Sequence, residues 1–369
     1  MIDSFIFNAE AMLLIDAHLD LSMNAMEWNR DLRLPVAIIR SNEAGLTDKP
    51  DRGNGTVSFP ALRSGNIGIV VGTLIARVKL PGQILPGWAS PEQAWAQIQG
   101  QLAWYKAMEA AGEIRIIQTQ LQLQQQIDIW NDSNILNEYK PIGVVLSLEG
   151  ADSLITPEYA IILQQQGLTA IGPAHYGPGR YANGTDASGH LNNNGIALLQ
   201  MMQQYGLALD ITHLCDDAMV DALQLFKGNI WASHHNCRTL VPHNRQISDV
   251  VIHSVIERNS VIGMAFDAWM MVPGWERGKS NPKTMQCNLA AIIPHIDHIC
   301  QLSGNSLHVG IGSDLDGAFG TEQSPYDLNT IADLQQLKHL LEAKGYSAND
   351  VENIFYKNWL REFSKVLPA

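Results

Sequence analysis

The regular alternation of short apolar runs with longer amphipathic stretches constrains the fold of this chain more than any other feature of its sequence. Each run is rich in Val, Ile, Leu or Ala and is short enough to be a buried strand. The runs lie at residues 13–17, 67–75, 114–118, 143–148, 169–172, 208–212, 230–233, 261–266 and 307–312, of which 114–118 is the weakest. Helical stretches are expected at 91–111, 196–205, 216–226, 248–258, 286–302 and 329–344. This order predicts a parallel sheet, because parallel strands are joined by long crossovers that helices supply.

The number of strand–helix units favours a closed barrel. About eight units in a chain of 369 residues match a (β/α)8 barrel of the TIM type, and an open doubly wound sheet is the alternative. No Pro- or Ser-rich linker and no internal repeat divides the sequence, so residues 1–369 are predicted to form a single domain. Glutamine is abundant in 97–126, but the Leu, Ile and Trp residues among the glutamines favour a surface helix over a disordered tract.

The acidic composition limits the partners of this chain. Its formal net charge is -13, whereas nucleic acid and anionic membrane surfaces both require basic patches. No apolar stretch approaches the roughly 20 residues needed to cross a bilayer. The first residues, Met1 to Ser4, lack the basic segment that opens a secretory signal. We therefore expect a small-molecule ligand, no nucleic acid or membrane partner, and a cytoplasmic location.

The cysteines do not form a recognisable framework. The four of them show no CxxC spacing: Cys215, Cys237, Cys287 and Cys300. We expect them to be reduced, buried residues and not a set of disulfides or a zinc knuckle.

Side chains that can bind metals follow the ends of the predicted strands. His18 and Asp20 lie two residues apart after the first apolar run, a spacing that points both side chains to one face of a strand. Five further candidates follow later runs: Glu149, His175, His213, His234 and Asp314. The carboxyl ends of the strands meet at one mouth of a barrel. Carboxylates and imidazoles gathered there need a cation to offset their desolvation.

The types of these ligands indicate the metal and its chemistry. His, Asp and Glu without Cys suit Zn²⁺ or another borderline divalent ion. Three imidazoles and two carboxylates exceed what one open catalytic zinc requires, so two ions are expected. Glu149 is the natural bridge, because the two oxygens of a carboxylate can hold metals roughly 3.5 to 4 Å apart. Such a pair lowers the pKa of a bridging water and polarises a carbonyl, which predicts a hydrolase.

Several segments together carry a family resemblance. They are Asp16-Ala17-His18-Leu19-Asp20, Ser147-Leu148-Glu149-Gly150, Asp210-Ile211-Thr212-His213, Ser233-His234, Val241-Pro242-His243-Asn244-Arg245 with Ser248-Asp249, and Gly310-Ile311-Gly312-Ser313-Asp314-Leu315-Asp316-Gly317. With these segments the chain resembles the membrane dipeptidase family of zinc peptidases, also called renal dipeptidases, in the form of its soluble bacterial members. The resemblance extends over most of the chain, to Asn358.

The resemblance implies a complete set of metal ligands. One zinc ion would be held by His18, Asp20 and Glu149, and a second by Glu149, His213 and His234, with a hydroxide bridging the two ions.

The resemblance also implies roles for three further residues. Asp314 would be the acid/base that takes the proton of the water and passes it to the leaving amine. His175 would contact the substrate carbonyl and its developing oxyanion, and Arg245 would pair with the carboxylate of a dipeptide. These roles agree with the physics of a bidentate guanidinium and of a carboxylate beside a dinuclear centre. The implied substrate is a small dipeptide, often with a D-residue at the carboxyl-terminal position, and the implied assembly is a homodimer.

Two segments depart from the family pattern. The family usually reads Thr-Leu-Thr-His around the substrate histidine, whereas this chain has Gly172-Pro173-Ala174-His175 followed by a glycine-rich loop. Residues 263–270, with Trp275 beyond them, replace a Val-Asn-Phe type of sequence. Both segments border the substrate in the family, so a reshaped pocket with a different side-chain preference is expected.

Several histidines near the motifs have less specific interpretations. His235 is adjacent to His234 and points to the opposite face of a strand, so it is interpreted as lying outside the ligand set. For His243 a supporting role and no role are equally favoured. The others are interpreted as surface or interface residues: His190, His253, His295, His298, His308 and His339.

Three aspartates have structural interpretations beside their functional ones. Asp16 and Asp210 would either orient metal ligands from behind or pack at strand ends. Asp316 is interpreted as a turn or cap residue, because Gly317 follows it.

Three classes of function agree with the sequence. The first is a dinuclear zinc dipeptidase. The second is another metal-dependent amidohydrolase on the same barrel, such as an N-acyl-amino-acid deacylase or a lactamase-like enzyme; many of these open with His-x-His and bridge their metals with a modified lysine, whereas this chain has His18-x-Asp20 and Glu149. The third is a binding or scaffold protein with a degenerate site, which the intact ligand set disfavours.

Overall fold

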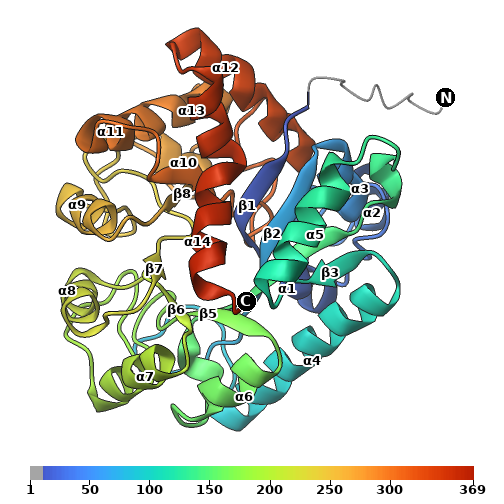
Figure 1. The fold of residues 1–369 in the computed structure, drawn as a ribbon. Coiled ribbons are helices and arrows are strands. Elements are labelled where there is room, and N and C mark those ends of the chain that lie inside the picture. The colour runs from blue at the N-terminus through green and yellow to red at the C-terminus, as the bar shows by residue number, and fades with distance from the viewer. Residues whose placement is uncertain (1–10) are drawn as a thin grey trace.

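The computed structural model describes residues 11–369 and shows a ring of strands surrounded by helices (Figure 1). The prediction made from Met1 to Ser4 falls outside the described residues. No helix of the described part is both long and apolar enough to cross a bilayer.

The sheet of the described residues contains nine parallel strands. They are β1 (Leu14–Leu19), β2 (Ile67–Leu74), β3 (Ile114–Ile116), β4 (Ile142–Glu149), β5 (Leu168–Gly172), β6 (Ala208–Asp210), β7 (Ile230–Trp231), β8 (Ile262–Met264) and β9 (Val309–Ile311). The hydrogen-bonded order is β7-β6-β5-β4-β2-β1-β9-β8, and β3 pairs with the first residues of β4. All nine lie within or beside the apolar runs that predicted them.

Backbone pairing at the end of β7 closes the ring. Ala232 forms a parallel bridge with Ile262 of β8. Its amide donates to the Val261 carbonyl at 3.1 Å, and its carbonyl accepts from the Gly263 amide at 2.8 Å. The prediction of a (β/α)8 TIM-type barrel is confirmed, and the alternative of an open doubly wound sheet is wrong.

Helices cover the outside of the barrel (Figure 1). They are α1 (Leu21–Glu27), α2 (Val36–Asn42), α3 (Phe59–Ser64), α4 (Pro91–Ala110), α5 (Gln120–Asn131), α6 (Tyr159–Gln165), α7 (Asn193–Gln204), α8 (Asp216–Leu225), α9 (Asp249–Glu257), α10 (Ala268–Met271), α11 (Ile293–Ser303), α12 (Leu337–Lys344), α13 (Ala348–Glu352) and α14 (Asn358–Val366). The described residues also form short 3₁₀ turns and one π-helical turn. They are η1 (Asn137–Tyr139), η2 (Ala151–Ser153), η3 (Leu289–Ile292) and η4 (Ile331–Gln336), and the π-helical η5 (Asn353–Lys357).

The predicted helices are present, with two differences in detail. The stretches 286–302 and 329–344 each begin with a 3₁₀ turn before the α-helix. The glutamine-rich stretch 97–126 is ordered, as expected, but it comprises the end of α4, strand β3 and the start of α5, and Gln126 is fully buried. Its amide donates to the carbonyls of Gly68 and Pro141 at 3.0 and 2.8 Å. The apolar setting is tolerated because these donors are satisfied.

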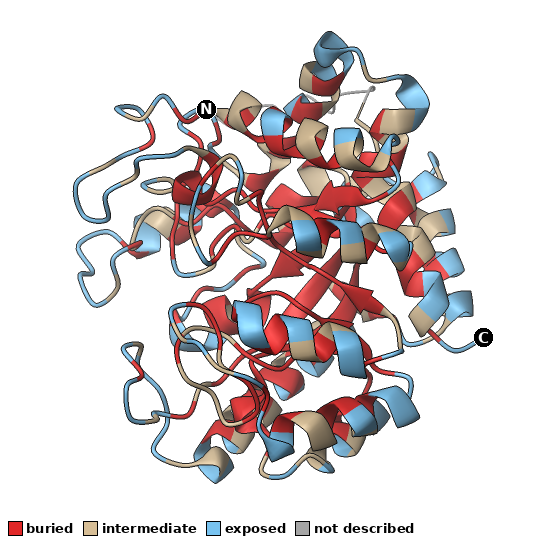
Figure 2. Cartoon of the chain, turned by 90° about the vertical axis from the view of Figure 1, so that its left-hand side faces the viewer, coloured by how far each residue is buried: buried red, intermediate tan, exposed pale blue. Residues whose placement is uncertain are grey.

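The interior of the barrel is packed, and α14 covers its amino-terminal end. Interior strand residues such as Ile69 and Val145 belong to the same apolar cluster as Trp231, Trp359 and Phe363. The Trp359 indole donates to the Ile311 carbonyl at 2.9 Å. Figure 2 shows the buried strands between the outer helices, with long loops gathered at the end opposite the chain's carboxyl terminus. A ligand site is therefore expected at the carboxyl ends of the strands, where these loops lie.

The burial of the cysteines and of two histidines tests two of the predictions made from the sequence. The cysteines are free, with three buried and Cys300 half-buried, close to what was expected. The surface interpretation is wrong for His295 and His308, which are both buried. Each is hydrogen-bonded to the backbone, His295 to Cys237 and Met271 and His308 to Ser260, so neither needs water.

Candidate metal centre

The predicted ligands all reach the carboxyl-end mouth of the barrel from different strands. His18 lies in β1 and Asp20 follows that strand directly, and Glu149 is the last residue of β4. His213 and His234 each lie three residues beyond the ends of β6 and β7. All five side chains are buried, as expected of ligands that surround an enclosed ion.

The Glu149 carboxylate is the centre of this cluster. Its Oε1 atom lies 3.2 Å from His213 Nε2, 3.5 Å from His234 Nε2 and 3.6 Å from His18 Nε2. The Nε2 atoms of His213 and His234 are themselves 3.2 Å apart. One oxygen thus lies within 3.6 Å of three ring nitrogens.

Among residues 11–369, three overlapping groups of side chains have the spacing of metal ligands, with ligand atoms within 4.8 Å of one another. One comprises His18, Asp20 and Glu149, and another comprises Glu149, His213 and His234. The third contains His18 and His234 with Asp314. The first two share Glu149 and have the same members as the two sets expected from the sequence.

Hydroxyl groups fix the orientation of several members. The Ser233 hydroxyl lies 2.8 Å from His234 Nδ1, and the Thr185 hydroxyl lies 3.1 Å from His213 Nδ1. These contacts leave Nε2 of each ring to face the cluster. The Thr73 hydroxyl donates to Asp20 Oδ1. Such partners behind metal ligands set the tautomer and the ring orientation.

Sequence reasoning missed two of these hydroxyls. Ser233 stands beside His234 in the sequence and was part of a quoted motif. Thr73 and Thr185 carry no comparable signal, because each is far along the chain from the side chain that it contacts.

Burial disfavours the charged forms throughout the cluster. Burial raises the pKa of Glu149 well above its usual value, and the nearby carboxylates of Asp20 and Asp314 raise it further. Burial lowers the pKa of His18 to about 3, with Arg245 contributing, and lowers the pKa values of His213 and His234 well below the usual range. Neutral imidazoles and closely spaced carboxylates direct lone pairs toward one another. A bound cation would relieve this repulsion.

His213 and Asp314 have left-handed backbone conformations. Their φ angles are 68° and 58°, a region that residues with a Cβ adopt at a cost of order 1–3 kcal/mol. Both residues follow a strand and turn their side chains to the mouth. Asp314 Oδ1 lies 3.7 Å from His18 Nε2.

His175 occupies the side of the cluster next to His213. Its Nε2 atom lies 3.8 Å from Glu149 Oε1, and its ring centroid is 4.4 Å from that of His213. Its other nitrogen, Nδ1, lies 3.2 Å from a guanidinium nitrogen of Arg77. Because an arginine can only donate, Nδ1 accepts and the ring proton is assigned to Nε2. Arg77 was not identified from the sequence.

A cavity of about 420 Å³ opens beside the cluster. Asp20, Glu149 and Asp314 line one part of it, and Arg245 lines another. Arg245 is 1% exposed, and its NH2 atom has no hydrogen-bond partner among the described residues. A buried guanidinium with an unused donor needs an anion, which the cavity has room to admit.

Two histidines form hydrogen-bond contacts with Arg245. His235 Nδ1 lies 3.3 Å from Arg245 NH1, and His235 is not a member of any of the three metal groups. The ring of His243 packs edge-on against Trp269, and its Nδ1 accepts from the Arg245 amide at 3.0 Å. His243 therefore shapes the loop that carries Arg245.

Asp16 and Asp210 fasten strand ends to each other. Asp16 Oδ1 accepts from the His18 amide and, at 2.8 Å, from the Ser313 amide beyond β9. Asp210 Oδ1 accepts from the Thr212 amide at 3.0 Å and from the Ser233 amide at 3.1 Å. Each carboxylate thus holds the backbone of two neighbouring strands.

Asp316 is more than a turn residue. Its φ of 62° fits the expected turn, but its buried carboxylate also accepts from the amides of Thr56 and Val57, and it lies 3.6 Å from Arg30. It ties the loop after β9 to the segment before α3.

The residues of the cluster fit a bound metal. His18 Nε2 is a buried nitrogen without a hydrogen-bond partner among the described residues, and it faces two carboxylates at 3.6 and 3.7 Å. The donors are imidazole nitrogens and carboxylate oxygens, the set that borderline divalent ions prefer. A closed barrel with such a cluster at its mouth and an arginine-lined cavity beside it defines a metal-dependent hydrolase of the barrel type.

Comparison with known proteins gives the family. The model of the membrane dipeptidase family, peptidase family M19, matches residues 7–367, so the chain belongs to this family and is a metallopeptidase. Dipeptidase tcpJ of Claviceps purpurea is 24% identical over 240 residues, which are 64% of this chain and 48% of that protein. An uncharacterized protein from the pqqA 5' region of Klebsiella pneumoniae is 26% identical over 243 residues, 62% of this chain and 84% of that protein.

Solved structures of this family have the same fold. The dipeptidase AC, a metallopeptidase of family M19, superposes with a TM-score of 0.76 at 20% identity over 98% of this chain and 100% of its own. A metallopeptidase from Rhodobacter sphaeroides, bound to a phosphinate mimic of the dipeptide L-Ala-D-Ala, superposes with a TM-score of 0.75 at 18% identity over 97% of this chain and 100% of its own.

Proposed function

We propose that this metallopeptidase is a dinuclear zinc dipeptidase. One observation carries the proposal: two groups of ligand atoms share the Glu149 carboxylate, and His18 Nε2 in one of them has no other partner. His18, Asp20 and Glu149 would hold one ion, and Glu149, His213 and His234 the other. Bound there, the zinc ions would lower the pKa of a water molecule and polarise the scissile carbonyl.

The protein's own groups would complete the chemistry. Asp314 lies beside His18, and burial raises the pKa of its carboxyl well above the usual value. It can therefore accept a proton from the attacking water and pass it to the leaving amine. His175, with its proton on Nε2, would donate to the carbonyl oxygen as negative charge develops.

Arg245 would hold the free carboxylate of the substrate. Its unused NH2 donors and its place on the cavity wall suit a bidentate pair with a planar carboxylate. The cavity of about 420 Å³ suits a small substrate such as a dipeptide. The ligand of the Rhodobacter sphaeroides relative favours L-Xaa-D-Xaa dipeptides as the first candidates.

The proposal covers the whole chain as one catalytic domain. Strands from around the ring supply the ligands, so no part of the barrel could hold both ions alone. The homodimer implied by the family resemblance is part of the proposal, and sedimentation equilibrium would test it.

The experiment that tests the function is hydrolysis of a panel of L-L, L-D and N-acylated substrates by zinc-loaded and chelated protein, with metal content measured alongside. We expect cleavage of free dipeptides that is lost on chelation and returns with about two zinc ions per chain. Turnover of N-acyl amino acids without dipeptide cleavage would identify a deacylase instead. Protein that binds no metal would contradict the ligand assignment.

Replacing Arg245 tests the assignment of the substrate carboxylate. Arg245→Ala should raise KM for dipeptides by roughly tenfold or more, with a smaller change in kcat, because the contact is present before the reaction. A dipeptide amide, which has no free carboxylate, is the control. An equal loss on the amide would contradict the assignment.

A further inference from the structure

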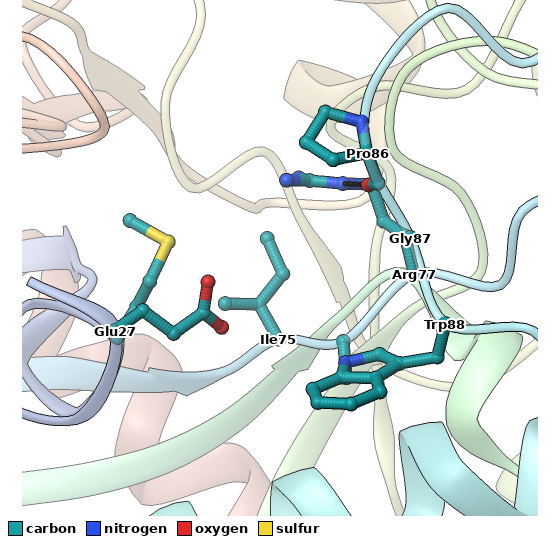
Figure 3. A pocket seen from close by; sticks show the side chains of 8 residues that line it. Glu27, Ile75, Arg77, Pro86, Gly87 and Trp88 are labelled. Atoms are coloured by element: carbon teal, nitrogen blue, oxygen red, sulfur yellow. Dashed lines mark hydrogen bonds between the residues drawn. The ribbon is translucent and has the colours of Figure 1, made fainter. Parts of the chain in front are cut away.

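Arg77 is a cationic side chain of the cavity that the proposed mechanism leaves without a ligand. It follows β2 and lines both the main cavity and a smaller adjoining cavity of about 240 Å³ (Figure 3). Its Nε donates to the Pro86 carbonyl at 3.4 Å, and its NH1 donates to His175 Nδ1 at 3.2 Å. An arginine has five N–H donors, so these two contacts leave three hydrogens for a ligand.

No carboxylate of the described residues lies within ion-pair distance of Arg77, although Asp20, Glu149 and Asp152 lie close enough for its charge to oppose the rise in their pKa values. Both of its hydrogen-bond acceptors are neutral, and no aspartate or glutamate of residues 11–369 forms an ion pair with it. Arginines elsewhere in the chain do have such partners; Arg30, for example, pairs with Glu43 and Asp51. Arg77 thus lines two cavities without a direct ion pair to any carboxylate of residues 11–369.

The charge of the main cavity points to an anionic ligand. Its walls carry the cations Lys49, Arg77, Arg245 and Arg277. Of its four carboxylates, only Asp267 lies outside the proposed centre of Asp20, Glu149 and Asp314. Outside that centre, four cations thus face one carboxylate, a local balance that favours anions although the chain as a whole has a net charge of -13.

Arg77 and Arg245 approach the cluster from opposite sides. In the closed ring, β2 and β7 are separated by β4, β5 and β6 in one direction and by β1, β9 and β8 in the other. Arg77 follows β2, and Arg245 lies in the loop after β7 next to His235. A dipeptide whose carboxyl-terminal end pairs with Arg245 would extend its amino-terminal residue toward Arg77.

The smaller cavity suits an acidic residue with a free ammonium group. Glu27 faces it from the end of α1, while Arg77, Pro86 and Trp88 face it from the segment after β2 (Figure 3). The cavity therefore offers a cation for a side-chain carboxylate and an anion for an ammonium group.

We propose that Arg77 selects substrates whose amino-terminal residue is acidic, an aspartyl or glutamyl residue, by pairing with the side-chain carboxylate. This inference rests on the proposed dipeptidase function, because Arg245 defines which end of the substrate faces Arg77. A dicarboxylic acyl group, as in N-succinyl-alanine, has the same carboxylate but lacks the ammonium group that Glu27 would favour.

The test compares charged and neutral dipeptides of equal shape. Zinc-loaded wild-type protein is assayed with Asp-Ala, Glu-Ala, Asn-Ala, Gln-Ala, the reversed Ala-Asp, and N-succinyl-alanine. We expect kcat/KM for Glu-Ala to exceed that for Gln-Ala by roughly tenfold or more. Calorimetric titration with L-glutamate and L-glutamine gives a readout that needs no turnover, and L-glutamate should bind more tightly.

Substitution of Arg77 separates selectivity from the support of His175. In Arg77→Met the preference for Glu-Ala over Gln-Ala should fall to near unity, mainly through KM, and Arg77→Lys should retain part of it. Lys106→Met on the exposed surface of α4 removes the same charge away from the cavity and should leave the preference unchanged. A uniform loss of kcat with an unchanged Glu/Gln ratio would overturn the inference and assign Arg77 to orienting His175 alone.

The outcomes on wild-type protein distinguish the two proposals. Failure to cleave any dipeptide would contradict the proposed function. Equal cleavage of the acidic and neutral members, or a preference for Ala-Asp over Asp-Ala, would overturn the role of Arg77 and leave the dipeptidase function intact. A stronger preference for N-succinyl-alanine would also overturn it.

Discussion

Each of the histidines His213 and His234 owes its orientation to one hydroxyl behind it. The Ser233 hydroxyl at 2.8 Å from His234 Nδ1 and the Thr185 hydroxyl at 3.1 Å from His213 Nδ1 hold the rings with Nε2 toward Glu149. At this scale, the geometry of the proposed centre depends on residues that bind no metal themselves.

Removing such a hydroxyl should weaken the centre without abolishing it. For Ser233→Ala we expect a loss of about 10- to 100-fold in zinc affinity, because His234 Nδ1 would remain buried and unpaired. Competition with a chromophoric chelator measures the affinity. Ser254→Ala is the matched control, since the Ser254 hydroxyl is exposed and bonds only to the backbone of α9. Unchanged zinc affinity in Ser233→Ala would contradict the assignment of Nε2 as the ligand atom.

Replacing the shared carboxylate should affect both ions. Glu149→Gln keeps the shape of the side chain but removes its charge and half of its acceptors. We expect the zinc content to fall from about two per chain toward zero, with loss of activity. Elemental analysis after dialysis against a weak chelator measures this. Full activity with two ions bound would refute the bridging role.

The carboxyl ends of neighbouring strands are joined by side chains and by close backbone contact. Asp16 joins β1 to the residues after β9, and Asp210 joins β6 to the residues after β7. Where the ring closes, Gly263 and Gly312 lie against the Ser233 carbonyl, with no room for a Cβ atom at either position. The positions of His234 and Asp314 therefore depend on the packing of whole strands.

A methyl group at Gly312 should disrupt this junction. In Gly312→Ala the new Cβ would collide with the Ser233 carbonyl, a backbone group that cannot rotate away. We expect a loss of unfolding free energy of about 3 kcal/mol or more. The control is Gly100→Ala inside α4, where the nearest atom is Met26 Cε at 3.5 Å. That change should stabilise the protein by about 0.5–1 kcal/mol. Urea unfolding of both variants is the measurement, and equal stabilities would contradict the packing argument.

The folded barrel encloses some ionisable groups in its apolar interior, and His295 is one of them. His295 in α11 is 1% exposed and lies between the loop after β7 and the end of α10, with Nδ1 accepting from the Cys237 amide at 3.0 Å and Nε2 facing the Met271 carbonyl at 3.2 Å. Burial lowers the pKa of His295 to about 4, with the Met271 carbonyl opposing the shift and His298 adding to it slightly. The folded protein therefore keeps this ring neutral where the unfolded chain would protonate it.

This pKa shift predicts that the free energy of unfolding falls at acidic pH. His295 binds its proton near pH 6.5 in the unfolded chain and near pH 4 in the folded chain. Its contribution to the free energy of unfolding is therefore complete above pH 6.5 and is lost as the pH falls toward 4. The loss should reach about 3 kcal/mol for this one group. Urea unfolding between pH 7 and pH 4 measures it, and the dependence should be shallower in His295→Gln. An identical pH profile in the variant would contradict the origin of the effect.

The sequence by itself determined the fold and the identity of the central side chains. The alternation of strands and helices predicts a barrel, and parallel strands bring their carboxyl ends together, so His18, Glu149, His213 and His234 could be assigned to one place before any contact was seen. The reason is that the order of strands and helices along the chain can be recognised from local sequence patterns. Strands that alternate with helices run parallel, so this order also gives the direction of the strands.

The tertiary structure alone decided which residues support and surround that cluster. Thr185 reaches His213, Arg77 reaches His175 and Gln126 is buried beneath β2 and β4 only because loops and helices distant in sequence pack there. His235 faces Arg245 for the same reason. Such contacts depend on the paths of loops and on side-chain packing, which no periodicity in the sequence encodes. The substrate preference of the cavity, unlike its chemistry, therefore follows from the three-dimensional arrangement.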